Sequence, residues 1–103
     1  PQYIKRIVKI INDDVKLDRS WSMFEQNFDR VHVDFLKRLR ELYPQLTPND
    51  QKLCAYLRMN LSTKEIASIM NISIRGVEIG RYRLRKKLML ETETNLSDFI
   101  MGL

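Results

Sequence analysis

Basic side chains are concentrated in one short stretch of this sequence, between residues 75 and 87. The stretch holds six basic residues against a single acid, Glu78, and this excess equals the formal net charge of +5 for the whole chain. Positive charge confined to one segment favours binding to a phosphate backbone, because lysine and arginine replace the counterions of a nucleic acid. A solvated basic surface is the ordinary alternative for such a run. The six basic residues are Arg75, Arg81, Arg83, Arg85, Lys86 and Lys87.

Helical spacing sorts this stretch into an inward and an outward face. Val77, Leu84 and Leu88 share the inward face of a helix. Phosphate contacts position a protein on DNA, whereas base contacts select a sequence. Six residues are expected to bind phosphates, two of them, Thr63 and Lys64, at the start of the preceding helix. The six are Thr63, Lys64, Ser73, Arg75, Arg83 and Lys86. Outward residues expected to read bases are Glu78, which can accept from a cytosine amino group, Ile79, which can pack on a thymine methyl, and Tyr82.

Residues that could support catalysis or bind a metal are few. His32 is the only histidine and Cys54 the only cysteine, so no metal-ligand set or disulfide is apparent. The three glycines form no phosphate-binding loop. We therefore expect no enzyme activity, no cofactor and no metal site, and we expect Cys54 to be a buried thiol.

Three short helices must position the basic stretch, and each has a recognisable start. Thr47 can cap a helix with Pro48 at its first position and Asp50 at its third. Ser62 repeats the pattern with Glu65 as a capping box. Ser73 then caps the basic helix itself. The apolar residues that fall at helical spacing over these segments are Leu53, Leu57, Ile66, Ala67, Ile69, Met70, Ile72, Val77, Leu84 and Leu88.

The gaps between these helices are short and contain asparagine. Asn60 precedes the Ser62 cap and Asn71 precedes the Ser73 cap, and both positions favour a left-handed backbone, which asparagine tolerates. A two-turn helix, a three-residue turn and a longer helix are typical of the helix-turn-helix that binds DNA. A three-helix core without any nucleic-acid role is the alternative that caps and core alone leave open.

Residues 46–103 resemble the LuxR/GerE-type helix-turn-helix, whose members read roughly L-T-x-x-E, S-x-K-E-I-A and I-S-x-x-T-V-K. The corresponding stretches are 46–50 (LTPND), 62–67 (STKEIA) and 72–78 (ISIRGVE). The resemblance implies an all-α, four-helix domain whose last helix, capped by Asn95, often carries a dimer contact. This sequence departs from the pattern at Asn60, Gly76, Glu78 and Gly80, so a different sequence preference is expected.

The whole chain, including W-x-x-F-E-x-x-F-x-x-V-H at residues 21–32, also resembles the C-terminal output segment of Bacteroidetes triple-tyrosine sensor-regulators. This resemblance implies upstream sensory domains in a longer chain. It is less specific than the helix-turn-helix resemblance.

The segments before residue 45 are expected to support the helix-turn-helix domain. Residues 1–20 are expected to form a connecting helix and linker. Residues 21–44 are expected to form one long helix, opened by a Ser22–Glu25 capping box and ended by Pro44. Its aromatic and apolar stripe recurs every seven residues, at Trp21, Phe28, Phe35 and Leu42. The expected domain then spans residues 45–103.

No apolar run approaches the roughly 18 residues that a membrane-spanning helix needs, and no secretory signal is visible. We therefore expect a cytoplasmic segment without direct membrane contact, whose full-length parent is compatible with a membrane anchor.

The expected function is that of a sequence-specific, double-stranded DNA-binding output domain of a bacterial transcriptional regulator, related to two-component signalling and acting as a homodimer. Two alternatives stay open. One is a sigma region 4-like module that works bound to RNA polymerase. The other is a dimerisation and protein-interaction module whose helix-turn-helix no longer binds DNA, an interpretation that Glu78 and Gly80 keep in view.

Overall fold

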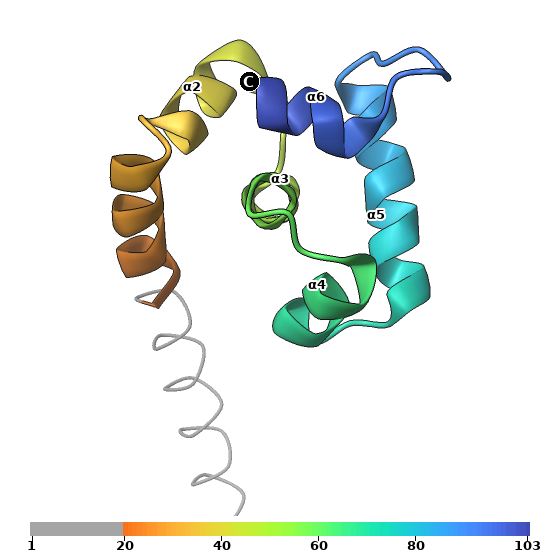
Figure 1. Cartoon of the computed structure of the whole chain (residues 1–103), viewed down its shortest axis with the longest axis horizontal. Helices are drawn as coiled ribbons and strands as arrows, with labels where there is room; N and C mark the ends of the chain where they lie inside the picture. Colours follow the sequence, from red (N-terminus) through yellow and green to blue (C-terminus); the bar gives the residue numbers. More distant parts are fainter. Residues whose placement is uncertain (1–19) are drawn as a thin grey trace, which may run out of the picture. The chain divides into compact units, whose positions relative to one another are not determined.

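The computed structural model describes residues 20–103, and these residues form α-helices joined by short turns (Figure 1). Within this described range there is no β-strand, and no helix is long and apolar enough to cross a membrane. The predicted all-α fold class is therefore confirmed. The connecting helix and linker expected over residues 1–20 lie, except for residue 20, outside the described residues. The chain divides into two compact units, with the boundary between Asp34 and Phe35.

The described part of the first unit is a helix over residues 20–31. Ser22 lies inside this helix, so the predicted Ser22 capping box does not begin it. Successive aromatic rings stack on one another along one side of this helix. The stacked ring centroids are 5.1 Å apart for Trp21 and Phe24, 5.5 Å for Phe24 and Phe28, and 4.2 Å for Phe28 and His32.

The single long helix expected to reach Tyr43 is interrupted at residues 32–34, and that prediction is wrong. Val33 and Asp34 have positive φ angles of 49° and 58°, which no continuous right-handed helix contains. The backbone N–H of Asp34 donates to the Asp29 carbonyl at 2.8 Å, closing the helix with the six-residue bond of a Schellman ending. No glycine or proline marks the interruption in the sequence.

The second unit contains five helices. They are α2 (Phe35–Leu42), α3 (Pro48–Arg58), α4 (Thr63–Met70), α5 (Ile74–Lys87) and α6 (Leu96–Gly102). Helix α3 is central: Figure 1 looks along its axis, and α2, α5 and α6 all pack against it. Helix α4 packs mainly on α5. The second unit is thus organised around α3, with the α4–α5 pair on one side.

The core of this unit contains most of the apolar residues that were predicted at helical spacing. Those that are buried are Leu53, Leu57, Ile66, Ala67, Val77, Leu84 and Leu88. Ile69 and Ile72 were predicted to join them, but they are 54% and 45% exposed. Helix α4 buries Ile66 and Ala67 and half-buries Met70, and this turns Ile69 away from the core. Ile72 lies in the turn after α4, where helical spacing no longer applies.

Left-handed residues end three helices of the second unit, as Val33 does in the first. Asn60, Asn71 and Met89 have φ angles of 61°, 55° and 56°. The following amide in each case donates to a carbonyl five residues back, with N···O distances of 3.2, 3.1 and 3.1 Å. The left-handed asparagines were predicted and are confirmed. The left-handed Met89 was not expected, since methionine has no preference for this backbone.

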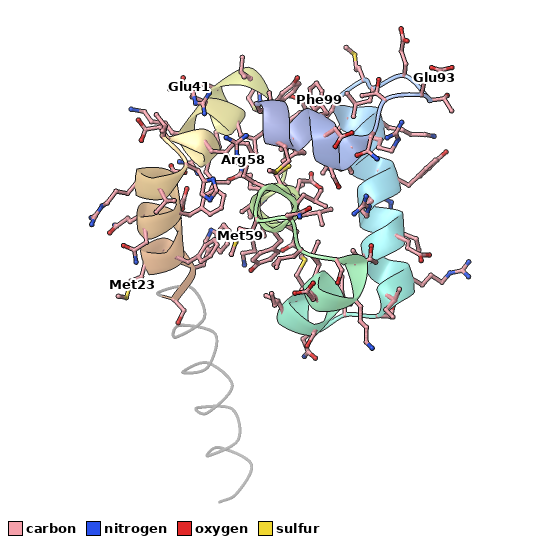
Figure 2. The ribbon with its side chains drawn as sticks, in the orientation of Figure 1. Met23, Glu41, Arg58, Met59, Glu93 and Phe99 are labelled. Carbon is pink, nitrogen blue, oxygen red and sulfur yellow. The ribbon has the colours of Figure 1, made fainter. Side chains whose placement is uncertain are left out.

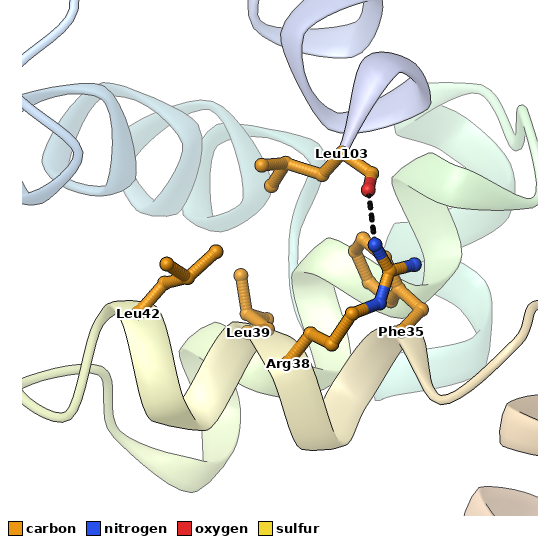
Figure 3. Close-up of a pocket in the computed structure, with 5 residues that line it drawn as sticks. All are labelled: Phe35, Arg38, Leu39, Leu42 and Leu103. Carbon is orange, nitrogen blue, oxygen red and sulfur yellow. Dashed lines mark hydrogen bonds between the residues drawn. The ribbon is translucent and has the colours of Figure 1, made fainter.

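The C-terminal helix α6 is held by arginines from two other helices. Arg58, labelled in Figure 2, lies in the last turn of α3. It donates from Nη1 to the carbonyls of Ile100 and Met101 at 2.9 and 2.8 Å. Its guanidinium also lies 4.9 Å from the centroid of the Phe35 ring. Arg38 Nη1 donates to the main-chain oxygen of Leu103 at 2.8 Å (Figure 3). These bonds supply donors to carbonyls at the end of α6, where helical carbonyls lack the usual amide four residues ahead. The Ile100 carbonyl also accepts from the Leu103 amide at 3.2 Å.

A small cavity lies beside the Arg38 bond, lined by Phe35, Leu39, Leu42 and Leu103 (Figure 3). Its volume is about 10 Å³. A space of this size holds about one water molecule, so it is a packing defect and not a ligand site.

Candidate nucleic-acid interface

Helices α4 and α5 both begin at the serines predicted to cap them. Ser62 Oγ accepts from the Glu65 amide at 3.1 Å, and Glu65 Oε1 accepts from the Ser62 amide at 3.2 Å, which completes the capping box at the start of α4. Ser73 Oγ accepts from the Gly76 amide at 2.9 Å at the start of α5. Left-handed Asn71 reverses the chain between them. Both predicted caps are thus present, and Asn71 and Ser73 bound the short turn between α4 and α5.

One side of α5 faces the core and the opposite side faces the surroundings. Val77 and Leu84 are 1% and 0% exposed. The stripe opposite them, at spacings of four, three and four residues, consists of Arg75, Ile79, Tyr82 and Lys86, all of which are exposed. Glu78 and Arg83 flank this stripe and are also exposed. The outward residues that the sequence singled out on α5 therefore share one continuous face, which we call the outer face.

The three remaining candidate residues lie at the starts of α4 and α5. Lys64 is exposed and Thr63 half-exposed in the first turn of α4. Ser73 is exposed at the N-terminus of α5, although its hydroxyl is already used as the cap. Backbone amides and a positive helix dipole make such helix starts favourable for phosphate oxygens.

Five of the six basic residues of α5 fall into two groups that the sequence did not separate. The sixth, Arg81, is half-buried. Arg85 donates to the carbonyls of Thr94, Glu91 and Thr92 at 2.5, 2.8 and 3.2 Å. It thereby holds the acidic loop that leads into α6. Lys87 pairs with Asp50 of α3. Arg85 and Lys87 are thus committed to the fold, while Arg75, Arg83 and Lys86 are exposed on or beside the outer face.

The Lys87–Asp50 pair joins the C-terminal end of α5 to the N-terminal end of α3. Lys87 Nζ lies 2.5 Å from Asp50 Oδ2, and the two side chains are 35% and 13% exposed. The same Asp50 oxygen accepts from the Thr47 amide at 2.9 Å, so it also completes the predicted capping box of α3. Burial alone would raise the pKa of Asp50, but the hydrogen bonds from Lys87 and Thr47 outweigh burial and lower it.

A groove of about 330 Å³ runs between the start of α3 and the flank of α5. Asn49 and Leu53 of α3 line it, together with Gly76, Gly80 and Arg83 of α5. The two glycines, four residues apart, contribute no side chains to this flank of α5. A Cβ atom added at Gly80 would lie 3.5 Å from Leu53 Cδ2, an ordinary contact distance. The packing of α5 on α3 therefore does not require glycine at position 80.

Two other predicted features concern Cys54 and metals. Cys54 is fully buried in α3, and burial together with the nearby Asp50 charge raises the pKa of its thiol to about 12. The thiol is therefore protonated at neutral pH and is a poor nucleophile, as expected for a structural cysteine. Among residues 20–103, no group of three or more His, Cys, Asp or Glu side chains is placed to hold a metal ion.

Comparison with known proteins gives one partial similarity. A 46-residue stretch, 45% of this chain, is 39% identical to the tetrathionate response regulatory protein TtrR of Salmonella typhimurium. The match covers 22% of that protein, so the aligned stretch spans about a fifth of the length of the curated relative. No protein-family model and no solved structure matches the chain. The similarity is therefore to one part of a response regulatory protein.

Proposed function

We propose that this chain is the DNA-binding output part of a transcriptional regulator and that the outer face of α5 enters the major groove of double-stranded DNA. The observation that carries the proposal is the exposed cluster of Arg75, Arg83 and Lys86 on a helix whose opposite side is buried. That helix follows a short capped helix and a three-residue turn, as in the helix-turn-helix. The partial similarity to a response regulatory protein agrees with this role.

The proposed contacts divide by chemistry. Thr63 and Lys64 at the start of α4 and Ser73 at the start of α5 bind phosphates, where the helix dipoles are positive. Arg75, Arg83 and Lys86 bind further phosphates along the groove. Base recognition falls to Ile79, in the middle of the outer face, and to Glu78 on its flank. Two copies of the chain bind two half-sites, so the operator is expected to have two-fold symmetry.

The phosphate contacts are tested by the salt dependence of binding to a fluorescent duplex, measured by anisotropy. Each neutralised phosphate contributes roughly −0.9 to the slope of log K against log salt concentration. Arg83→Ala and Lys86→Ala should each flatten the slope by about 0.9 and weaken binding to all duplexes similarly. Lys37→Ala is the matched control, because it removes one exposed positive charge on α2, away from the outer face. Equal slopes for all three variants would show that α5 does not contact the backbone.

A further inference from the structure

Two residues of the outer face are in direct contact with each other. Lys86 Nζ lies 4.6 Å from the centroid of the Tyr82 ring, one helical turn earlier in α5. Tyr82 is 59% exposed and Lys86 is exposed, so neither side chain belongs to the core. Packing of the fold therefore does not explain an aromatic residue at position 82.

The chemistry of the pair explains what the ring can do. An ammonium group over an aromatic face is attracted by the ring quadrupole. The ring occupies one side of the ammonium group, and the N–H donors on its other side stay available. A lysine stem has many rotamers, and ordering it on a phosphate costs side-chain entropy. A lysine already held on a ring is partly ordered before it binds.

Because Tyr82 and Lys86 lie on the stripe opposite Val77 and Leu84, the held ammonium group is presented on the side of α5 that faces away from the core. We propose that Tyr82 is a positioning residue for Lys86: its ring holds the ammonium group where a DNA phosphate binds. This inference rests on the proposed function. It replaces the base-reading role expected for Tyr82 from the sequence with a role that depends on the ring and not on the hydroxyl group.

The contact itself is tested without DNA, by NMR of the full chain. Protons beside an aromatic face shift upfield, so the Lys86 Hε resonances should be shifted upfield in the wild type and in Tyr82→Phe. They should return to ordinary lysine positions in Tyr82→Leu, which keeps apolar bulk but has no ring. Identical Hε shifts in all three proteins would overturn the positioning role.

The consequence for binding is tested with a duplex of arbitrary sequence at one fixed salt concentration. Tyr82→Phe should bind as the wild type does, and Tyr82→Leu should bind about 2- to 5-fold more weakly, the range expected for an exposed cation–π contact. In a Lys86→Gln background, Tyr82→Leu should have no further effect, because the ring then has no cation to position. Circular dichroism melts of each variant provide the control for folding.

Two results would overturn this proposal while leaving the proposed function intact. One is a loss of affinity in Tyr82→Phe equal to that in Tyr82→Leu, which would assign the contact to the hydroxyl group. The other is a full effect of Tyr82→Leu in the Lys86→Gln background. A folded wild-type chain that binds no duplex, with the upfield Lys86 shift present, would instead overturn the proposed function, and the positioning role with it.

Discussion

Gly80 occupies the middle of α5, where every residue except proline is more favourable than glycine. Since a Cβ atom at this position meets only Leu53 Cδ2, at 3.5 Å, alanine fits without displacement. We predict that Gly80→Ala raises the free energy of unfolding by up to about 1 kcal/mol, measured by urea denaturation.

Gly76→Ala is the comparison for this prediction. An added Cβ there would lie 3.2 Å from Ser73 Oγ, the atom that caps α5, so the gain should be smaller. A Gly80→Ala protein less stable than the wild type would show that α5 approaches α3 more closely than these distances indicate.

For single residues, the sequence predicts which side chains are basic and point outward, but not which group each of them binds in the fold. The excess of basic residues over 75–87 is visible in the sequence, and the helical period separates outward from inward positions. The commitment of Lys87 to Asp50 is not visible, because the two residues are 37 positions apart and meet only when α5 packs on α3. Arg85 could not be assigned for a similar reason, since its acceptors are carbonyls of a loop whose conformation it helps to hold.

Helix ends are the main feature at the scale of elements. Within the described residues, helices end at left-handed Val33, Asn60, Asn71 and Met89. The last three of these lie in the second unit. Helix starts and the two asparagine endings depend on neighbouring residues, so they could be predicted from local chemistry. The endings at Val33 and Met89 could not, because a β-branched and a long side chain adopt left-handed backbone there without any local preference. The interruption at residues 32–34 was missed for this reason.

Met89 gives a direct test of this interpretation. It is 83% exposed and has φ of 56°, so its side chain contributes little packing while its Cβ opposes the left-handed backbone. We predict that Met89→Gly stabilises the chain by about 0.5 to 1 kcal/mol in thermal or urea denaturation.

Met59 is the matched control for Met89. It is also an exposed methionine at the C-terminal end of a helix, but its φ is −78°. Met59→Gly should therefore destabilise the chain, because glycine gains nothing at this backbone conformation and loses more entropy on folding. The same sign for both substitutions would contradict the left-handed ending at Met89.

The Asp50–Lys87 pair predicts how stability depends on pH. The pKa of Asp50 is lower in the folded state than its ordinary value, so ionised Asp50 favours the folded chain. This contribution is fully present above the unfolded-state pKa of about 3.9 and is lost as the pH falls through the lower folded-state pKa.

We therefore expect Asp50→Asn to be less stable than the wild type at neutral pH, by on the order of 1 to 3 kcal/mol, and this difference to shrink below about pH 4. Asp98→Asn, an exposed residue at the start of α6, controls for the loss of one negative charge. Urea denaturation at a series of pH values measures the effect. A difference between wild type and Asp50→Asn that stays constant down to pH 2 would contradict it.

For the whole molecule, the distribution of charge matters more than its sum. The chain carries a formal charge of +5, and cations are exposed on a helix whose other side is buried. The class of binding partner could be proposed from sequence because phosphate recognition needs only positive charge on a positioned helix. Which bases are preferred could not, because base contacts depend on distances of a few ångströms between Glu78, Ile79 and a groove that is itself deformable.

We propose that this chain binds DNA in a sequence-specific way as a dimer, and binding sites selected from a random duplex library would show whether it does. We predict that the folded 103-residue chain enriches one motif and that the motif has two-fold symmetry, with half-sites about one helical turn apart or a multiple of it. Failure of the well-folded chain to enrich any motif over the starting library would contradict the claim.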